Sequence, residues 1–367
     1  AAAERQMDSV TQFTLGAAVG AAMLGPRVGM RKAALVGGLM GTVPDLDTFL
    51  PSPDPVTSFT SHRGFSHSLI VQALVTPLFA EPLVRVFRDL KDKRVLTYLA
   101  VYLIFATHAL IDGMTVYGTR LFWPIYEHPV GVGSIFIIDP LYTIPLLFVT
   151  LWALLLNPAS LRFKGWLKGA LLVSTLYMAG TAVLQQWAGK QAQAWLDTQG
   201  IDPERTLSIP TPFNVLYWRT IVMDGPRYLN LYHPLIGEGV TVYAHPRHPE
   251  LEGCLANTGA FRELTAFTKG FYSMEETDGK IVFSDLRMGL TPNYVFRFKL
   301  GEMKEGLPRA VNPPTREPTV RGTNGDLDWL LAGINGDHTV RPAEADAYQP
   351  ETGFKLAADA ALPPPCS

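Results

Sequence analysis

Apolar segments recur between Gln12 and Trp187, and several approach the roughly 20 residues that a helix needs to cross a bilayer. This pattern predicts a helical membrane domain over residues 1–190. We expect about six helices, near Thr11–Leu24, Lys32–Val43, His67–Phe87, Val95–Asp112, Asp139–Asn157 and Trp166–Trp187. The first two are short and are joined by Gly25-Pro26-Arg27, so they also fit a tilted pair or a tight hairpin.

The connections between these helices differ in positive charge. Eleven basic residues lie in three alternate connections, at Arg27, Arg31, Lys32, Arg85, Arg88, Lys91, Lys93, Arg94, Arg162, Lys164 and Lys168. The opposite connections carry only Arg63 and Arg120. Because Lys and Arg in short loops stay on the cytoplasmic side, we expect a multi-pass membrane protein with Arg63 and Arg120 on the exoplasmic face, which is the periplasmic face if the source is a Gram-negative bacterium. After an even number of crossings, the chain beyond Trp187 emerges on that face too.

The character of the sequence changes beyond Trp187. Alternating segments such as Val240–Tyr243 predict strands. We therefore expect a small, mostly β extramembrane domain over residues 202–303, exoplasmic like the loops above, with one helix near Ala260–Lys269. Residues 304–367 are rich in Pro and show no sustained apolar period, which predicts an irregular tail.

Charge and cysteine content narrow the possible functions. The 31 basic and 33 acidic residues give a net charge of −2, whereas a nucleic-acid-binding protein normally has a concentrated basic surface. Two cysteines, Cys254 and Cys366, are too few for a cysteine-built zinc module, although they could pair in an oxidising compartment. Any metal site must therefore use His and carboxylate side chains.

Side chains of the types that bind metals, Asp and His, lie near the exoplasmic ends of the expected helices. Asp45 and Asp47 follow the second helix, and paired carboxylates suit divalent cations, although Pro-Asp is also common in turns. His62 and His67 lie five positions apart before the third helix. Imidazole is a common zinc ligand, but both histidines would also fit an interfacial position.

Two further motifs add candidates. His108 and Asp112 are four positions apart near the end of the fourth helix and so project from one face, either toward a metal or in a hydrogen bond that only locks the packing. Asp139 precedes a proline, which is also the pattern of a helix N-cap. Arg63 and Arg120 could hold an anion such as phosphate, or anchor the interface.

The expected topology places all these carboxylates and imidazoles at one membrane face. Seven potential ligands at one depth are hard to explain as separate helix caps, and they would be enough for one or two metal ions. The set is Asp45, Asp47, His62, His67, His108, Asp112 and Asp139. Glu127-His128 fits a solvated loop better, and His245 and His248 fit surface positions.

Three of these segments resemble the YdjM-like family of inner-membrane proteins, which are described as metal-dependent hydrolases. They are Pro44–Asp47, His62–Ser68 and His108–Asp112, the last continuing through Thr115, Tyr117, Gly118 and Pro124. The family usually has Thr where this chain has Ser66, which does not change a ligand. The resemblance covers about the first half of the chain and implies a membrane-embedded metal site and hydrolase activity, without naming a substrate.

These features together favour a hydrolase that uses a divalent ion, zinc by ligand type. The expected metal ligands are Asp45, Asp47, His62, His67, His108 and Asp112, and the candidates for catalysis are His62, Asp139, Arg63 and Arg120. Water acidified by the ion would attack a phosphoester or acyl carbon, with His62 or a carboxylate as general base. A site at this depth suits a lipid or lipid-linked substrate.

Two other functions fit the same residues. A transporter or channel would pass an ion or proton along His and Asp, but it needs polar groups at mid-depth, where Gln72, Glu81 and Gln185 are the main ones. A non-catalytic scaffold would use the metal only to hold helices together, and a closed shell of four ligands would favour it.

Overall fold

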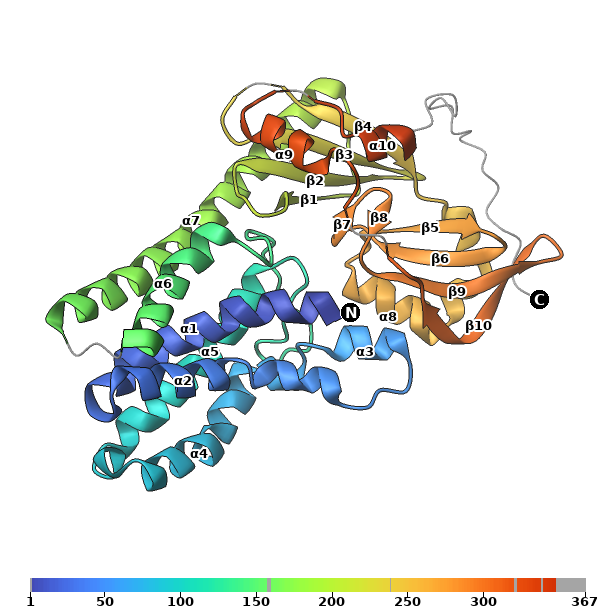
Figure 1. Cartoon of the computed structure of the whole chain (residues 1–367). Coiled ribbons are helices and arrows are strands. Elements are labelled where there is room, and N and C mark those ends of the chain that lie inside the picture. The colour runs from blue at the N-terminus through green and yellow to red at the C-terminus, as the bar shows by residue number, and fades with distance from the viewer. Residues whose placement is uncertain (1, 157–159, 238, 320–321, 338, 348–367) are drawn as a thin grey trace. The chain divides into compact units, whose positions relative to one another are not determined.

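A helical region comes first in the chain and a sheet-rich region follows it (Figure 1). This computed structural model describes residues 2–156, 160–237, 239–319, 322–337 and 339–347. The chain divides into two compact units, which we treat separately. Unit 1 comprises residues 1–50, 62–183 and 212–214, and unit 2 comprises residues 51–61, 184–211 and 215 onward. The expected order, a helical membrane region and then a sheet-rich domain, is confirmed.

All six expected helices are present. They are α1 (Ala2–Val28), α2 (Met30–Gly41), α4 (Leu69–Val86), α5 (Arg94–Met114), α6 (Pro140–Leu156) and α7 (Leu161–Gln199), with 3-10 helices η1 (Pro44–Phe49), η2 (Phe65–His67) and η3 (Arg88–Leu90). In the described residues, α4, α5 and α7 are each long and apolar enough to span a membrane, and α6 is a shorter apolar helix. The helix expected from His67 begins at Leu69 instead, because His67 belongs to η2.

The first two helices form the tight hairpin that the sequence allowed. The chain reverses at Gly29, whose φ of 89° is readily adopted only by glycine. The two helices then approach so closely that a Cβ atom on Gly37 would collide with the carbonyl oxygen of Gly16. Glycines on both helices therefore allow the backbones to touch.

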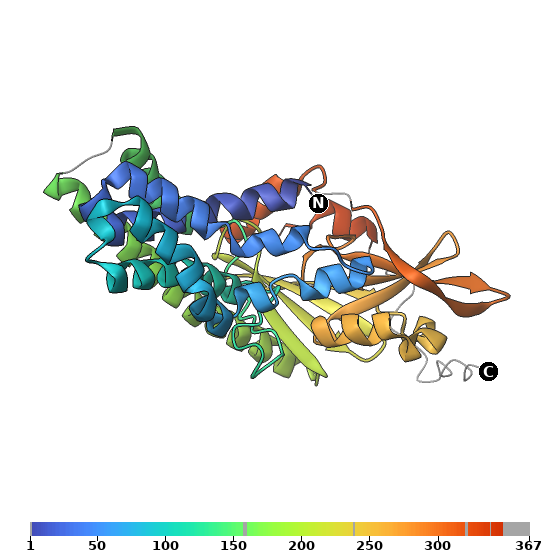
Figure 2. The same cartoon turned by 90° about the horizontal axis from the view of Figure 1, so that it is seen from below.

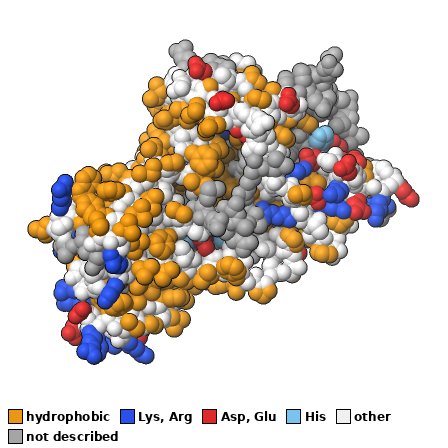
Figure 3. Space-filling view, viewed as in Figure 1, with side chains coloured by type: hydrophobic (Ala, Val, Ile, Leu, Met, Phe, Trp, Pro, Cys, Tyr) orange, Lys and Arg blue, Asp and Glu red, His pale blue; other side chains and the backbone are white. Residues whose placement is uncertain are grey.

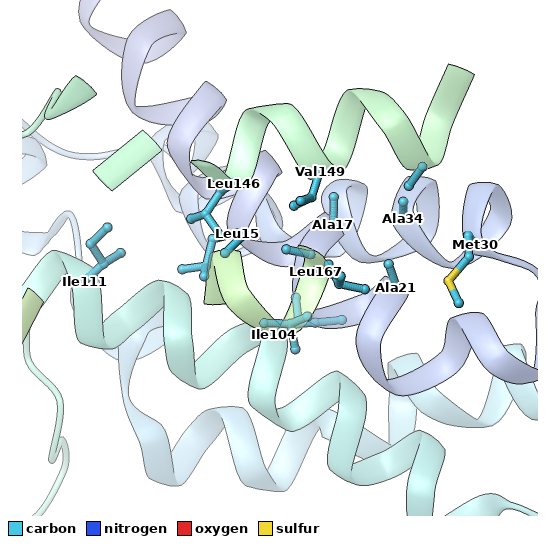
Figure 4. Packing of buried hydrophobic residues seen from close by; sticks show 14 of the residues in the cluster. Leu15, Ala17, Ala21, Met30, Ala34, Ile104, Ile111, Leu146, Val149 and Leu167 are labelled. Carbon is cyan, nitrogen blue, oxygen red and sulfur yellow. The ribbon is translucent and has the colours of Figure 1, made fainter. Parts of the chain in front are cut away.

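The core of unit 1 lies between α1, α2, α5, α6 and the start of α7 (Figure 4). Both Figure 1 and Figure 2 show α1, α2 and α5 side by side. The buried side chains that join these helices include Leu15, Ala21, Ile104, Leu146 and Leu167. Other apolar side chains of the spanning helices face outward, such as Leu74 and Leu78 of α4, which are 74% and 73% exposed. Outward-facing leucines are what a lipid-facing helix requires.

The basic connections come together at one end of unit 1. Arg31, at the start of α2, donates hydrogen bonds to the carbonyl oxygens of Leu154 and Leu155 at the end of α6. Leu90 of η3 packs in one cluster with Leu24 near the end of α1. Figure 3 shows Lys and Arg gathered at this end, beside an extensive apolar surface.

Unit 2 is built on two four-stranded antiparallel sheets, ordered β1-β2-β3-β4 and β10-β9-β6-β5, and a two-stranded β7-β8 ribbon. The strands are β1 (Arg205–Pro210), β2 (Tyr217–Asp224), β3 (Arg227–Pro234), β4 (Thr241–Pro246), β5 (Tyr272–Thr277), β6 (Lys280–Asp285), β7 (Gly289–Leu290), β8 (Asn293–Tyr294), β9 (Arg297–Lys304) and β10 (Leu307–Arg316). The helices are α3 (Pro55–Ser61), α8 (Gly259–Phe267), α9 (Asp326–Ile334) and α10 (Pro342–Ala347), with 3-10 helices η4 (Pro249–Leu251) and η5 (Gly253–Asn257).

The boundaries of unit 2 differ from those expected. The tail expected to be irregular from residue 304 contains β10, α9 and α10. β10 tolerates its prolines because it is an edge strand, with a register shift between Ala310 and Thr315. At the other boundary, α3 joins unit 2, where the Phe59 ring lies 4.8 Å from the ring of Phe267. Cys366, which could pair with Cys254, lies outside the described residues.

Candidate metal centre

Four side chains of unit 1 bring one potential ligand atom each to a common point: Asp45 of η1, His67 of η2, and His108 and Asp112 of α5. These four atoms all lie within 4.8 Å of one another. We call these residues the ligand group. It is the one such group of three or more His, Cys, Asp or Glu side chains found across the described residues.

The spacing in the ligand group fits a tetrahedral ion. His67 Nε2 lies 3.0 Å from His108 Nε2, 3.3 Å from Asp45 Oδ1 and 3.2 Å from Asp112 Oδ2. His108 Nε2 lies 3.4 Å from Asp45 Oδ1 and 3.6 Å from Asp112 Oδ2. Zinc bonds of about 2.0–2.1 Å in tetrahedral geometry separate neighbouring ligand atoms by about 3.3 Å. These five separations are close to the edges of a zinc tetrahedron, and the sixth pair, Asp45 and Asp112, lies within 4.8 Å.

Both imidazoles are oriented through their other ring nitrogen. His108 Nδ1 donates to the carbonyl oxygen of Gly41, 2.7 Å away at the end of α2. The Ser66 hydroxyl donates to Asp47 Oδ2 at 2.7 Å, so it accepts from His67 Nδ1 at 2.9 Å. With hydrogen on Nδ1, each neutral ring presents the Nε2 lone pair to the group, which is the usual way in which metal-binding histidines are held.

Asp112 supplies an oxygen that lacks a hydrogen-bond partner. Its Oδ1 accepts a hydrogen bond from Gln12 Nε2 at 2.8 Å. Its Oδ2 is buried, has no hydrogen-bond partner in the described residues, and faces the ligand group, with Arg63 Nε 3.2 Å away. Buried polar atoms are nearly always hydrogen-bonded, so this exception requires an explanation, and a bound cation is one.

Among the described side chains, the charge around the ligand group leaves a deficit of two positive charges. Three carboxylates, of Asp45, Asp47 and Asp112, lie near a single guanidinium, that of Arg63. With neutral imidazoles the sum is −3 + 1 = −2, which one divalent ion would neutralise. Buried charges are costly unless they are compensated.

The pKa values of Asp45 and His67, which lie outside the spanning helices, indicate which groups carry charge when no metal is bound. Burial would raise the pKa of the Asp45 carboxyl, but His108 and His67 hold it well below its usual range. Burial would lower the pKa of the His67 imidazole, but the carboxylates of Asp112 and Asp45, which lie 3.2 and 3.3 Å from its Nε2, raise it to about 9. Without a metal, His67 therefore carries the proton that compensates the carboxylates.

Asp47 and His62, both expected as ligands, lie outside the group of four. Asp47 Oδ1 pairs with His62 Nδ1 at 2.8 Å, and its Oδ2 accepts from the Ser66 hydroxyl and from the Arg63 backbone N–H. Burial opposes ionisation of Asp47, but the bond to His62 lowers its pKa. The His62 ring lies 5.8 Å from that of His67, measured between ring centres, and is 23% exposed. His62 and Asp47 form a pair beside the ligand group.

Asp139 also lies outside the ligand group. It caps the N-terminus of α6, which was the alternative role expected from the proline that follows it. Its Oδ1 accepts hydrogen bonds from the backbone N–H groups of Leu141 and Tyr142 at the start of α6. Its Oδ2 accepts from the Tyr177 hydroxyl at 2.8 Å. All of these bonds serve the helix end and its packing against α7.

The two candidate arginines have different surroundings. Arg63 is buried, adopts a φ of 60°, and directs its guanidinium to Asp112 and to the Thr115 hydroxyl. Arg120 is half-buried; its backbone N–H donates to the Arg63 carbonyl oxygen, and its Nε has no hydrogen-bond partner in the described residues. Arg63 is therefore committed to the protein, and Arg120 is the arginine better able to contact an anion.

The other polar residues considered in the sequence lie partly where they were expected and partly elsewhere. Glu127 and His128 are exposed, as expected for a solvated loop. His245, interpreted as a surface residue, is buried and bonds to Glu344 Oε1 at 3.0 Å, a partner 99 residues away that no local pattern indicates. The roles of Gln12 and Ser66 beside the ligand group were also missed. A lone glutamine in an apolar helix was the available signal for Gln12.

Comparison with known proteins finds a family match that includes the ligand group. Residues 7–188, about half of the chain, match the family model described as YdjM inner membrane protein. This range contains all four residues of the ligand group. The chain is also similar to a protein of Bacillus subtilis (strain 168) named uncharacterized protein YfhP, with 33% identity over an alignment of 143 residues that covers 36% of this chain. The matched part spans 42% of that relative's length. No solved structure matches the chain.

Proposed function

Because the chain belongs to the YdjM family of inner-membrane proteins, we propose that it is a membrane-embedded, metal-dependent hydrolase whose ion is held by Asp45, His67, His108 and Asp112. The observation that carries the proposal is the convergence of two Nε2 atoms and two carboxylate oxygens within 4.8 Å of one another, with both carboxylate oxygens 3.2–3.3 Å from His67 Nε2. Hydrolase activity, the metal and the substrate are parts of this proposal.

Zinc is the ion that the ligand group favours. Magnesium and calcium prefer six or more oxygen ligands, whereas two imidazoles and two carboxylates in a tetrahedron suit zinc. The deficit of two charges supports one ion rather than two. When bound, such an ion polarises a scissile group and makes water acidic near neutral pH.

The residues around the ligand group would prepare the reaction. Asp45 is 23% exposed, whereas the other three ligands are buried, so its side of the group is the open one. His62, also partly exposed, is oriented by Asp47 through Nδ1, which leaves Nε2 to take a proton as general base. Arg63 would hold Asp112 ionised. Arg120 would contact an anionic part of the substrate.

An amphiphilic ester or phosphoester, such as a lipid, is the substrate class that we propose. The turns that carry Asp45 and His67 also expose large apolar side chains, although they are not membrane-spanning helices. These side chains are Leu46, Phe49, Leu50 and Phe65, which are 54%, 71%, 54% and 50% exposed. Exposed apolar side chains beside a metal centre suit the boundary between lipid tails and headgroups.

The orientation of the protein is a further part of the proposal. The ligand group lies at the end of α2, before α4 and at the end of α5, which are the helix ends opposite to the basic connections. The excess of Lys and Arg would keep those connections in the cytoplasm, so the metal centre and unit 2 would be exoplasmic. To test this, a single cysteine is introduced at Ser52 or at Lys91, and intact cells are treated with a thiol reagent that does not cross the membrane. We expect labelling at position 52 only, and labelling at position 91 alone would refute the orientation.

The hydrolase proposal is tested with three variants. His67→Ala should abolish stoichiometric zinc, and His62→Ala should keep the zinc but lower hydrolysis by about 100-fold or more, the usual effect of removing a general base. The exposed His128→Ala is the control. Purified protein is assayed for metal by elemental analysis, and for turnover with p-nitrophenyl phosphate, p-nitrophenyl acetate and a fluorescent phospholipid in micelles. Full zinc content in His67→Ala would refute the proposed metal site.

A metal-held scaffold is the second candidate, because four protein ligands can complete a tetrahedral zinc shell without an open position. The same variants separate the two functions. A scaffold requires zinc for folding but hydrolyses none of the probes, and His62→Ala then leaves every measured property unchanged. An ion or proton transporter would instead show metal or proton uptake in reconstituted vesicles.

A further inference from the structure

A small pocket lies beside the ligand group within unit 1. Its lining comes from α1, the end of α5, the segment before α6 and the start of α6, and includes Gln12, Asp112, Thr115, Asp139 and Tyr142. Asp112 belongs to both the pocket and the ligand group. The pocket therefore contacts the centre from the side of α1, which the hydrolase proposal does not use.

Gln12 connects the pocket to the ligand group, and its amide has one possible orientation. The side chain is 4% exposed, and Nε2 lies 2.8 Å from Asp112 Oδ1. An ionised carboxylate can only accept hydrogen bonds, so the NH₂ group must face Asp112 and the amide oxygen must face away from it. This oxygen, Gln12 Oε1, is buried and has no hydrogen-bond partner in the described residues.

The hydrogen bond from Gln12 decides which way Asp112 turns. Arg63 Nε lies 3.2 Å from Asp112 Oδ2, and a guanidinium readily pairs with both oxygens of a carboxylate. Gln12 donates to Oδ1, and a hydrogen bond there opposes rotation of the carboxylate toward such a pair. Asp112 Oδ2 then stays 3.2 Å from His67 Nε2, inside the ligand group.

We propose that Gln12 is a positioning residue of the metal centre, which holds Asp112 Oδ1 so that Asp112 Oδ2 remains available as a ligand. The inference rests on the proposed metal site and extends it to α1, which supplies none of the four ligands. The pocket provides room for a small hydrogen-bond donor, such as a water molecule, to satisfy Gln12 Oε1 and hold the amide in place.

The test compares metal binding by variants of the full chain in detergent. Gln12→Met keeps the size of the side chain but removes the hydrogen bond, and Gln12→Asn keeps the amide but is one carbon too short to reach Asp112. Gln191→Met is the matched control, because Gln191 also has a buried Oε1 that lacks a partner among the described residues, but its Nε2 donates to the Leu235 carbonyl oxygen in unit 2. Zinc affinity is measured by chelator competition, and the coordination of the probe ion Co²⁺ by its visible spectrum.

We expect both Gln12 variants to bind zinc about 10- to 100-fold more weakly, as when other partners of metal ligands are lost. Their Co²⁺ spectra should weaken and shift, because more than one water would take the place of Asp112 and raise the coordination number. Gln191→Met should match the wild type in both measurements. Since a destabilised protein would not change the Co²⁺ spectrum of its folded fraction, the spectrum separates positioning from folding. If Gln12→Met does not fold, Gln12→Asn decides.

An affinity within about threefold of the wild type, together with an unchanged Co²⁺ spectrum, in a folded Gln12 variant would overturn the inference while the metal site stands. An effect of equal size in Gln191→Met would also overturn it. If the wild type takes up neither Zn²⁺ nor Co²⁺, the proposed metal site itself fails.

Discussion

At the residue scale, the side chains around the ligand group are as specific as the ligands themselves. Gly41 and Ser66 orient the two imidazoles, and Gln12 and Arg63 contact the two oxygens of Asp112. Such contacts fix ring orientation and keep carboxylates ionised, which preorganises a metal site. The centre is therefore a network in which every ligand except Asp45 is held by a neighbour.

The raised pKa of His67 predicts how metal binding depends on pH. In the metal-free protein this pKa is about 9, so below pH 9 the imidazole is protonated and a metal ion must displace the proton. Zinc affinity should therefore fall by about tenfold for each pH unit below 9, and one proton should be released per ion bound at neutral pH. Chelator competition across pH 6.5–9.5, with calorimetry in two buffers, measures both quantities. An affinity that does not change over this range would contradict the assignment of His67 as a ligand.

At the element scale, glycines of α1 and α2 allow one helix to touch the other. The approach carries the Gly41 carbonyl oxygen at the end of α2 to its hydrogen bond with His108. Close packing of small residues is a common way to join helices in membranes. The hairpin therefore contributes to the metal centre although it supplies none of the four ligands.

Gly37→Ala tests this packing. The new Cβ meets the Gly16 backbone, which cannot move aside as a side chain can, so we expect a loss of about 1–3 kcal/mol in the free energy of unfolding. Gly180→Ala on α7 is the control, because a Cβ there has nothing within 4 Å. Thermal unfolding in detergent compares the two. Equal stability of both variants would show that the close approach is not needed.

At the scale of the whole molecule, the chain carries two units with separate cores and separate buried polar networks. In unit 2, the carboxylate of Glu344 on α10 accepts hydrogen bonds from Asn230, Tyr232 and His245 of the first sheet. It is fully buried. These bonds attach the last described helix to the sheet, which explains why a segment without an apolar period is ordered.

Glu344→Ala should destabilise unit 2 and spare the metal centre. The change leaves three buried donors without an acceptor, and each such group costs about 1–3 kcal/mol. We expect rapid proteolysis of unit 2 with an unchanged zinc content in unit 1. Exposed Glu276→Ala is the control and should resist proteolysis like the wild type. Loss of zinc in Glu344→Ala would show that the two units do not fold separately.

The sequence predicted the helices better than the ligands, and particular residues show why. Asp45 and Asp47 have the same local pattern, yet only Asp45 reaches the ligand group. In a 3-10 helix, which has three residues per turn, side chains two positions apart point about 120° apart, so the two carboxylates of η1 leave the helix in different directions. The sequence suggested a turn at this position but not its type, and it could not show that Asp47 pairs with His62.

Apolar segments, loop charge and the motifs around Asp45, His67 and His108 were readable in the sequence alone, because lipid demands continuous hydrophobic helices and tolerates charge only with a partner. Those demands act on each segment separately. Which donors meet, and which neighbours hold them, depended on contacts between segments far apart in the chain, such as the 100 residues between Gln12 and Asp112. Only packing in three dimensions decides such contacts, because local patterns carry no information about the distance between segments.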